Sequence, residues 1–367
     1  MRLINRVTCT LFAAALALLP AAPLRAQMPA PPVSSEKLLH VGGYAGVVMG
    51  AAPATATQNI EVSQSVVAAL LSGTLIPRLT YFAELEAASR SRENWTGDSE
   101  HDAFDVERLY AEVTVADALR IRAGRFLTPV GQWNEDHADP LTWTPQRPLT
   151  TYRPFAKSTT GLLIAGQFSI AGRDAGYALY GTPRRIESER EEAVFSHALG
   201  GRLAMEVVPG MTIGASFTEF RASRPVVTDD DQEHETEVED GDTIPEEPEV
   251  EDRVEDTATR RLFGADLRLE ARWLSIHAEA TTLSATADRP RERGAFVQTA
   301  IPLFLGISAV GRVEYYDPVV SSTLRVGTAG LTYRPVPRVA IKVAHQWTSR
   351  VSRRAPAGWF VSLSGLL

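Results

Sequence analysis

The chain has 367 residues, a formal charge of -8 and a single cysteine. One cysteine cannot form an internal disulfide framework, and no stretch beyond the first 26 residues approaches the ~18 to 20 consecutive apolar residues of a membrane-spanning helix. A disulfide-stabilised small domain and a helical membrane protein are therefore excluded.

Residues 1–26 have the pattern of a secretory signal peptide. Arg2 and Arg6 precede an apolar run that begins at Cys9, and Ala26 is a small residue at a cleavage point before Gln27. Cleavage would remove the only cysteine. We expect an exported protein, in which residues 27–36 form a short periplasmic lead and residues 37–367 form the folded domain.

From residue 37 onward, apolar residues recur with a period of two in segments bounded by Gly, Pro, Asp or Asn. Leu267 and Leu269, for example, alternate with Asp266, Arg268 and Glu270. Strands with one apolar and one ionic face suit a transmembrane barrel, although a soluble sandwich also alternates. The predicted strands are residues 37–50, 59–73, 77–90, 103–115, 118–126, 158–170, 174–182, 195–206, 211–222, 259–270, 273–284, 293–303, 306–316, 322–334, 338–349 and 357–367.

The connections between these strands alternate in length. Turns of a few residues, such as Val208-Pro209-Gly210, lie between longer loops. Short turns at one end and long loops at the other are typical of outer-membrane barrels. We therefore predict an all-β fold: a transmembrane antiparallel β-barrel of about 16 strands with its long loops outside. Interfacial aromatic residues are expected near strand ends, where the sequence places Trp273, Tyr333, Trp347 and Trp359.

The third long loop, residues 127–157, differs from a solvated tether. It contains Trp133 and Trp143, several prolines and few charges, whereas a flexible segment would be polar and without aromatic residues. We expect this loop to pack against other parts of the protein.

The start of this loop resembles a known family. Residues 123–131 read Ala-Gly-Arg-Phe-Leu-Thr-Pro-Val-Gly, and Trp133-Asn134 and His137-Ala138-Asp139-Pro140-Leu141 follow. This segment resembles the strand-to-loop segment of bacterial outer-membrane porins related to the phosphate-selective O/P family. The resemblance implies a third loop that folds into the lumen and narrows the pore. By analogy with porins it also implies a homotrimer in the outer membrane of a Gram-negative bacterium.

The same resemblance implies the function. We expect passive diffusion of small hydrophilic solutes with a preference for anions, and neither a cofactor nor a chemical step. The lysine-rich phosphate site associated with the family is largely absent, because the only lysines are Lys37, Lys157 and Lys342. Arginine could bind phosphate in its place, but nothing in the sequence shows that it does.

Charged residues near the third loop are candidates for lining the pore and for selecting which ions pass through it. A ring of one sign of charge in a narrow pore concentrates the potential on the permeating ion. Alternatively, the basic candidates pair with nearby carboxylates, including Glu135 and Asp136, and only balance the charge of a polar inner wall. The candidates are Arg108, Arg120, Arg122, Arg125, Arg147, Arg153, Lys157, Glu84, Glu86 and Glu112.

The segment 223–258 is predicted to be an acidic extracellular loop. Its residues 229–256 hold 16 carboxylates and one base, Arg253, while the chain outside this segment and the signal peptide has a net charge of +4. Such a composition predicts a disordered, solvated loop. It could gather divalent cations or repel anions and bacteriophage, but it lacks the Asp-x-Asp-x-Asp-Gly register of a calcium loop, so no metal site is predicted.

An enzyme is not expected. The sequence has no nucleophile-elbow, zinc-protease or phosphate-loop motif, and Ser196 and His197 are adjacent on one strand and point to opposite faces. His277 lies on the same face as Glu279, where a charge network explains it equally well. Residues 27–36 are too few for the plug domain of a TonB-type receptor.

The sequence also allows a second function. The protein could be a surface protein that acts as an adhesin or phage receptor without significant channel activity. The final strand, with Trp359, Val361 and Leu363 on one face, resembles the assembly signal of outer-membrane proteins, although it ends in Leu367 where Phe is usual. The expected partners are outer-membrane lipid, lipopolysaccharide and the barrel assembly machinery, and nucleic acid is not among them.

Overall fold

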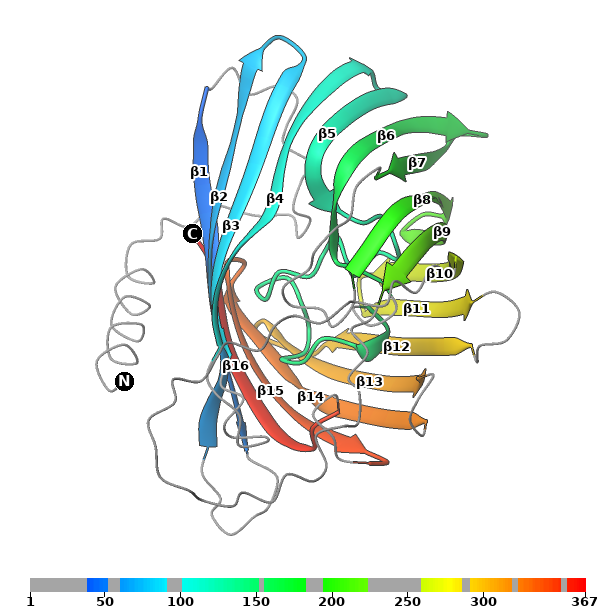
Figure 1. Cartoon of the computed structure of the whole chain (residues 1–367). Helices are drawn as coiled ribbons and strands as arrows, with labels where there is room; N and C mark the ends of the chain where they lie inside the picture. The colour runs from blue at the N-terminus through cyan, green and yellow to red at the C-terminus, as the bar shows by residue number, and fades with distance from the viewer. Residues whose placement is uncertain are drawn as a thin grey trace, which may run out of the picture.

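The computed structural model is a closed barrel of sixteen antiparallel strands (Figure 1). It describes residues 38–51, 60–90, 101–151, 155–182, 194–223, 259–285, 291–318, 323–350 and 355–367. Each strand pairs with its neighbours in the sequence, and β1 pairs with β16 to close the ring. The predicted fold class and strand number are confirmed. The predicted signal peptide, the lead after it and the acidic residues 229–256 lie outside the described residues.

The strands alternate in direction around the barrel. They are β1 (His40–Ala51), β2 (Ile60–Ile76), β3 (Leu79–Arg90), β4 (His101–Ala116), β5 (Leu119–Leu127), β6 (Ser158–Ile170), β7 (Arg173–Gly181), β8 (Val194–Val208), β9 (Met211–Ser223), β10 (Thr259–Ala271), β11 (Leu274–Ala285), β12 (Glu292–Pro302), β13 (Ile307–Asp317), β14 (Leu324–Val336), β15 (Val339–Thr348) and β16 (Gly358–Leu366). A short 3-10 helix, η1 (Leu149–Thr151), lies in the third long loop.

Each predicted strand overlaps an observed one, and the ends differ by a few residues. The largest extension is at β2, which continues past Gly73 to Ile76. Gly73 is compatible with the strand because its missing side chain leaves room for Leu38, whose carbonyl oxygen accepts a hydrogen bond from the Tyr81 hydroxyl at 2.8 Å. A glycine that looks like a strand end therefore marks a close backbone approach.

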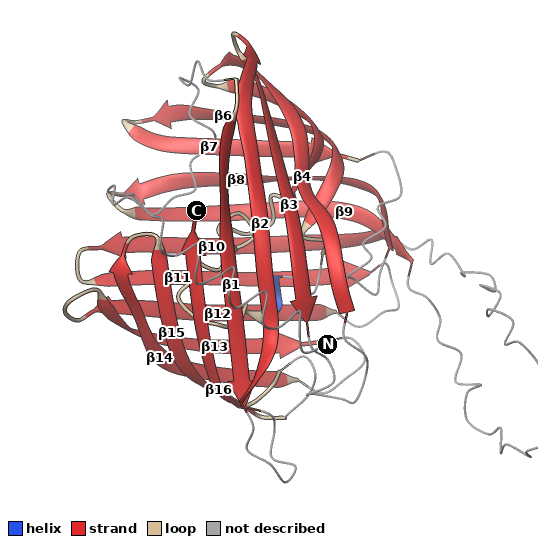
Figure 2. Ribbon diagram, turned by 90° about the vertical axis from the view of Figure 1, so that its left-hand side faces the viewer, coloured by secondary structure: helices blue, strands red, loops and turns tan. Residues whose placement is uncertain are grey.

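The β6–β7 turn has the conformation typical of a two-residue hairpin. In the β6–β7 turn Ala171 and Gly172 have φ of 51° and 73°, and two successive positive φ values are typical of a type I′ turn, whose twist matches that of the strands. The sequence order then places all the tight turns at one end of the barrel and all the longer connections at the other, as predicted. Figure 2 shows the turns at the ends of the strand pairs β6–β7 and β10–β11.

The two faces of the strands differ as the alternation predicts. On β4, Leu109 and Val113 are exposed on the outside, whereas Tyr110 and Glu112 are 6 % and 4 % exposed on the inside. The four aromatic residues expected near strand ends are all exposed: Trp273 and Tyr333 near the turns, and Trp347 and Trp359 near the longer loops. Among the described residues, no helix has the length and apolar character to cross a membrane.

The third long connection does not extend away from the barrel. Residues 128–151 and 155–157 fold back into the interior, where Figure 1 shows them within the ring of strands. The predicted inward fold of this loop is confirmed, and its docking positions the candidate site.

Candidate functional site

The two ends of the inward loop are tied together where it leaves the wall. Thr128 donates its N–H to the Lys157 carbonyl at 3.0 Å and its hydroxyl to the Ala156 carbonyl at 2.7 Å. The Asn134 amide donates to the carbonyl oxygens of Thr128 (2.8 Å) and Lys157 (2.7 Å). Buried backbone groups need partners, and this clasp supplies them without regular secondary structure. The loop therefore starts and ends at one fixed point.

The end of the loop packs on an apolar part of the inner wall. Phe155 lies edge-on to Phe220 of β9, with 4.8 Å between ring centroids. Phe126, Tyr180 and Leu262 belong to the same buried cluster. These side chains come from β5, β7, β9 and β10, so apolar packing fills part of the lumen beside the loop-side ends of those strands.

Trp133 anchors the first half of the loop on β11 and β12. The carboxylate of Glu279 accepts the backbone N–H groups of Gln132 at 2.7 Å and Trp133 at 2.5 Å. The indole stacks on His277, with centroids 5.5 Å apart, and contacts the ring of Phe296 edge-on at 5.7 Å. One wall carboxylate thus satisfies two loop amides, and two wall rings hold the indole.

Gly131 permits this contact. Its φ is +68°, and a Cβ atom at this position would lie 2.8 Å from the Cδ of Glu279. A side chain would therefore be strained by the backbone angle and would collide with the carboxylate. The glycine of the Pro129-Val130-Gly131 segment is required by loop docking.

Cations on β14 and β15 bind the tip of the loop. Arg334 donates to the carbonyl oxygens of Pro140 (2.5 Å) and Thr142 (3.1 Å), and its guanidinium lies 4.9 Å from the ring centroid of Trp143. Lys342 donates to the Thr142 hydroxyl at 2.7 Å. The loop reaches this wall with a series of backbone carbonyls, which these cations satisfy.

Arg312 on β13 holds the next part of the loop. Its guanidinium donates to the Thr144 hydroxyl (2.5 Å) and the Gln146 carbonyl (2.7 Å), and it pairs with Glu314 at 2.7 Å. Glu314 in turn accepts the N–H of Leu149 at 2.8 Å. The Arg312–Glu314 ion pair therefore has donors and acceptors left over, and these bind η1 and the residues before it.

Asp139 lies against β1, whereas Lys342 is on β15, so the two residues lie on opposite sides of β16. A Cβ atom on Gly46 would be 2.6 Å from the Asp139 Oδ2, and this oxygen is buried with no hydrogen-bond partner among the described residues. Burial raises the pKa of the Asp139 carboxyl, and nearby Lys342, whose ammonium donates to the Asp139 carbonyl, acts in the opposite direction. The loop tip thus contacts strands on both sides of β16.

Two of the predicted arginines share one carboxylate on the inner wall of β4 and β5. Glu112 lies 2.7 Å from Arg122 and 3.8 Å from Arg120. The Arg122 guanidinium also stacks over the Tyr110 ring, 4.0 Å from its centroid. Because one carboxylate serves two guanidinium groups, this part of the wall carries a local excess of positive charge.

Acidic residues of the loop face cations of the opposite wall. Asp136 pairs with Arg268 of β10 at 2.7 Å. Glu135 is exposed inside the barrel, and Arg202 and Arg122 are the cations that act on it most strongly. Arg202 itself forms a two-bond pair with Asp266, at 2.5 Å and 3.0 Å. The interior therefore has ions of both signs.

The remaining predicted residues occupy different surroundings. Arg108 pairs with Glu84, and Glu86 accepts a hydrogen bond of 3.4 Å from Tyr44. Arg147 stays within the loop, where it donates to Thr151 at 2.8 Å. Arg153 lies outside the described residues.

Arg125 does not share a face with Arg120 and Arg122. It is the register partner of Leu109, whose side chain is 56 % exposed on the outside. Its guanidinium lies 3.8 Å from Asp105. Strand parity alone separates Arg125 from the other two, because side chains alternate between faces.

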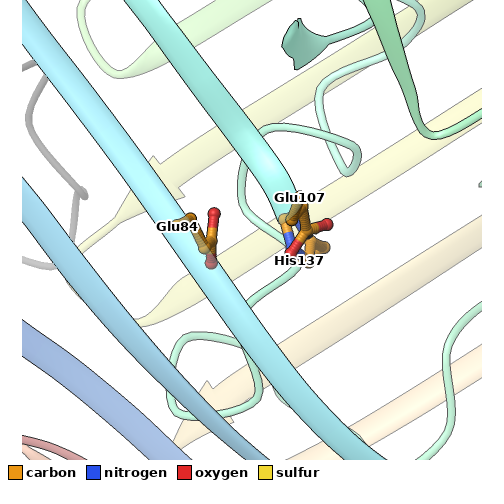
Figure 3. Close-up of side chains that lie close together, drawn as sticks. All are labelled: Glu84, Glu107 and His137. Atoms are coloured by element: carbon orange, nitrogen blue, oxygen red, sulfur yellow. Dashed lines mark hydrogen bonds and ion pairs between the residues drawn. The ribbon is translucent and has the colours of Figure 1, made fainter. Parts of the chain in front are cut away.

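Figure 3 shows a cluster at the root of the loop that has ligand atoms of the kind metals prefer. Oxygens of Glu84 and Glu107 and a ring nitrogen of His137 lie within 4.8 Å of one another. Arg108 already pairs with Glu84, and Lys157 and His137 with Glu107. The carboxylates are matched by protein cations, so the cluster acts as an ion-pair network that fixes the loop.

Several residues that hold the loop were not singled out from the sequence. They lie on wall strands distant in sequence from the loop: Arg312, Glu314, Arg334 and Lys342. Alternation along this strand puts Arg312 and Glu314 on one face and Val313 and Tyr315 on the other. Nothing in the sequence said which wall the loop would reach.

Comparisons with known proteins support the fold. No family model matches the chain, and no curated protein matches it, so the resemblance to the phosphate-selective family has no further support. Among solved structures, OmpF of Salmonella typhi in complex with daunomycin is 13 % identical, with 89 % of this chain and 96 % of that chain covered and a TM-score of 0.56. An anion-selective porin from Comamonas acidovorans is 11 % identical, with 89 % and 98 % covered and a TM-score of 0.55. A mutant of the Rh. blastica porin is 10 % identical, with 90 % and 100 % covered and a TM-score of 0.52. The chain has the fold of bacterial outer-membrane porins.

The surroundings of Asp139 give a prediction about pH. An acid whose pKa is raised on folding destabilises the folded state once pH exceeds its unfolded value of about 3.9, and the penalty is complete above its folded pKa. Asp139→Asn keeps the size and removes the charge. We expect the variant to unfold at a higher temperature than the parent at pH 8, with the difference vanishing below about pH 4.

The measurement is thermal unfolding of the detergent-solubilised barrel by circular dichroism across this pH range. Asp117→Asn, in the exposed β4–β5 turn, is the control and should show no such gap at pH 8. A parent that is more stable than Asp139→Asn at pH 8 would contradict the prediction.

Proposed function

We propose that the protein is an outer-membrane channel for the passive diffusion of small hydrophilic solutes. The observation that carries the proposal is the inward loop, which docks on the wall through residues of β10 to β15 and leaves charged side chains in the interior. Glu135 is exposed although inner-wall ions surround it, so water reaches the interior. A water-filled barrel with a loop across it can limit solutes by size and charge.

The outer surface supports the membrane location. On β10 the outward residues from Phe263 to Ala271 are apolar, and these eight steps span about 26 Å along the strand and about 20 Å in height at a tilt of ~40°. That height approaches the ~25 Å apolar band of outer-membrane barrels. Exposed Trp273 near the turns and Trp347 near the loops would sit at the two interfaces. Export through the signal peptide predicted at residues 1–26 is part of this proposal.

The distribution of charge supports only a weak preference for anions. Arg120 and Arg122 share Glu112, which gives the wall of β4 and β5 excess positive charge, while Glu135 offsets it from the loop. Arg108, Arg125, Arg202, Arg268 and Arg312 pair with carboxylates, whereas Arg334 and Arg147 bind oxygen atoms of the loop. A dedicated phosphate site is not proposed, because the two lysines near the loop, Lys157 and Lys342, bind Glu107 and the loop tip.

We propose that the protein forms a homotrimer, by analogy with porins. The outward face of β1 to β5 supports self-association. On this face the described residues are small or apolar, and they carry no charge apart from Arg125 on β5. They include Ala45, Val47, Val67, Ala69, Ala83, Leu85, Ala111 and Val113. Small side chains let two sheets approach closely in an apolar environment.

The channel is tested by planar-bilayer recording of the purified protein. We expect stepwise conductance, and in Trp133→Ala a larger or noisier conductance, because loss of the buried indole removes about 3–5 kcal/mol of packing. Trp273→Ala is the matched control, since this indole is 69 % exposed outside the barrel, and should conduct like the parent. A protein without conductance steps would overturn the channel and favour an adhesin or phage receptor.

The selectivity is tested by the reversal potential under a KCl gradient. Glu135→Gln should shift it toward anions, and Arg120→Gln with Arg122→Gln should shift it toward cations, because each change removes one side of the charge balance. Each shift should shrink at 1 M salt, where the screening length is about 3 Å. Shifts of the opposite sign would show that these residues do not face the conducting path.

The trimer is tested by light scattering of the detergent-solubilised protein. We expect a protein mass three times that of one mature chain. Replacing Ala69 and Ala111 by Arg should convert the trimer to monomers, because a charge in this apolar face lacks a partner. The same change at Leu203 on β8, which is 61 % exposed, is the control. A monomeric parent would exclude the trimer without affecting the channel.

A further inference from the structure

Four arginines form a row on the outside of the barrel, at the loop-side ends of its strands. Arg221 lies near the end of β9, and Arg261, Arg293 and Arg325 lie near the starts of β10, β12 and β14. All four are exposed. Each shares its strand face with an exposed apolar residue further along the strand: Phe217, Phe263, Val297 and Leu331. The guanidinium groups of this arginine row therefore point away from the lumen.

Aromatic side chains lie directly below the arginine row. Phe217 and Phe263 contact each other, with 5.0 Å between ring centroids. Tyr315 is the register partner of Arg325 and is 40 % exposed. Trp347 lies over Gly327, two residues from Arg325, and is 54 % exposed. Each end of the row thus combines cations with rings at the edge of the apolar surface.

The acidic residues on this face do not balance the row. Glu219 pairs with Arg261 at 2.8 Å, and both side chains are exposed. Asp317 is the register partner of Arg293, and its carboxylate also accepts a hydrogen bond from Thr323 at 3.1 Å. Two carboxylates therefore stand against the four guanidinium groups of the row. Among the described residues, the Arg325 guanidinium forms no ion pair. The face has a net positive charge at the level where the apolar surface ends.

The described outward residues of the opposite half differ. At the corresponding level β1, β3 and β4 present Met49, Ala87 and Phe104 to the outside, and Arg125 near the end of β5 is the one outward arginine described on β1 to β5. The four arginines of the row thus gather on β9 through β14, which Figure 1 shows on one side of the ring. A general need for cations at the membrane surface would not produce such a one-sided distribution.

We propose that the arginine row binds the phosphate groups of membrane lipids in the outer leaflet. Guanidinium groups bind phosphate through two parallel hydrogen bonds, and aromatic rings favour the boundary between headgroups and acyl chains. Arg293 and Arg325 are separated by one strand and offset by two residues along it, since their partners on β13 are Asp317 and Tyr315. With strands 4.7–4.9 Å apart and about 3.3 Å per residue, their backbones are about 12 Å apart, so the two side chains can hold two phosphates of one headgroup or of two neighbouring lipids. This inference rests on the membrane location proposed above.

A soluble phosphate ion fits this surface less well. It would gain nothing from the rings or from the apolar surface below, and its binding to exposed arginines in water would be weak and screened by salt. A lipid phosphate is held at the right height by its acyl chains. The occupant is therefore expected to need both a phosphate and an apolar anchor.

The test is lipid binding by the purified full chain in nonionic detergent, measured by native mass spectrometry. The probes are lipid A with two phosphates and the same lipid after removal of its phosphates. The double variant Arg293→Gln and Arg325→Gln is compared with Arg272→Gln and Arg338→Gln, which removes the same charge in turns at the other end of the barrel. Circular dichroism verifies that both variants fold.

We expect the parent and the turn variant to bind the phosphorylated lipid equally, and the row variant to bind it at least tenfold more weakly. The dephosphorylated lipid should bind all three proteins alike, and inorganic phosphate should not displace the lipid. Equal losses in both variants, no loss in either, or displacement by inorganic phosphate would overturn the proposal. Bilayer conductance should be the same in the row variant and the parent, so failure of lipid binding is distinguishable from failure of the channel.

Discussion

Closure of the sheet is the constraint on which the rest of the structure depends. The pairing of β1 with β16, from Tyr44 and Leu366 at one end to Gly50 and Phe360 at the other, leaves no free strand edge. Backbone groups without partners are very costly in lipid, and a closed barrel satisfies them all within the wall. Closure also separates an outer apolar face from an inner polar one, so each strand needs strict alternation.

The polar inner face in turn makes it possible to hold an irregular loop inside the barrel. In the described part of the loop the short helix η1 is the only regular structure, so most of the amides and carbonyls there need external partners. Glu279 and Glu314 accept its N–H groups, whereas Arg334 and Arg312 donate to its carbonyl oxygens. The charged wall residues therefore have a structural use, and the ions that remain near Glu135 set the electrostatics of the interior.

The outer face is not uniform around the ring. The strands from β1 to β5 present small apolar side chains, and those from β9 to β14 carry arginines at their loop-side ends. The first pattern favours close contact between apolar surfaces and the second favours anionic headgroups. Both depend on the same alternation, because an outward charge is tolerated only near the ends of a strand, where water and headgroups can reach it.

The sequence by itself determined the strands, their number and the two ends of the barrel, because period-two alternation and turn residues are local properties. The composition of the third loop predicted that it packs against other parts of the protein, and the resemblance to porins implied that it folds inward; both expectations held. Only the tertiary structure decided where that loop docks: Arg312, Arg334 and Lys342 are more than 150 residues from the segments they bind. It also decided which ions pair, placing Arg120 and Arg122 on one carboxylate and Arg125 on a different face. Pairing depends on strand register and on distances across the lumen, which no local pattern encodes.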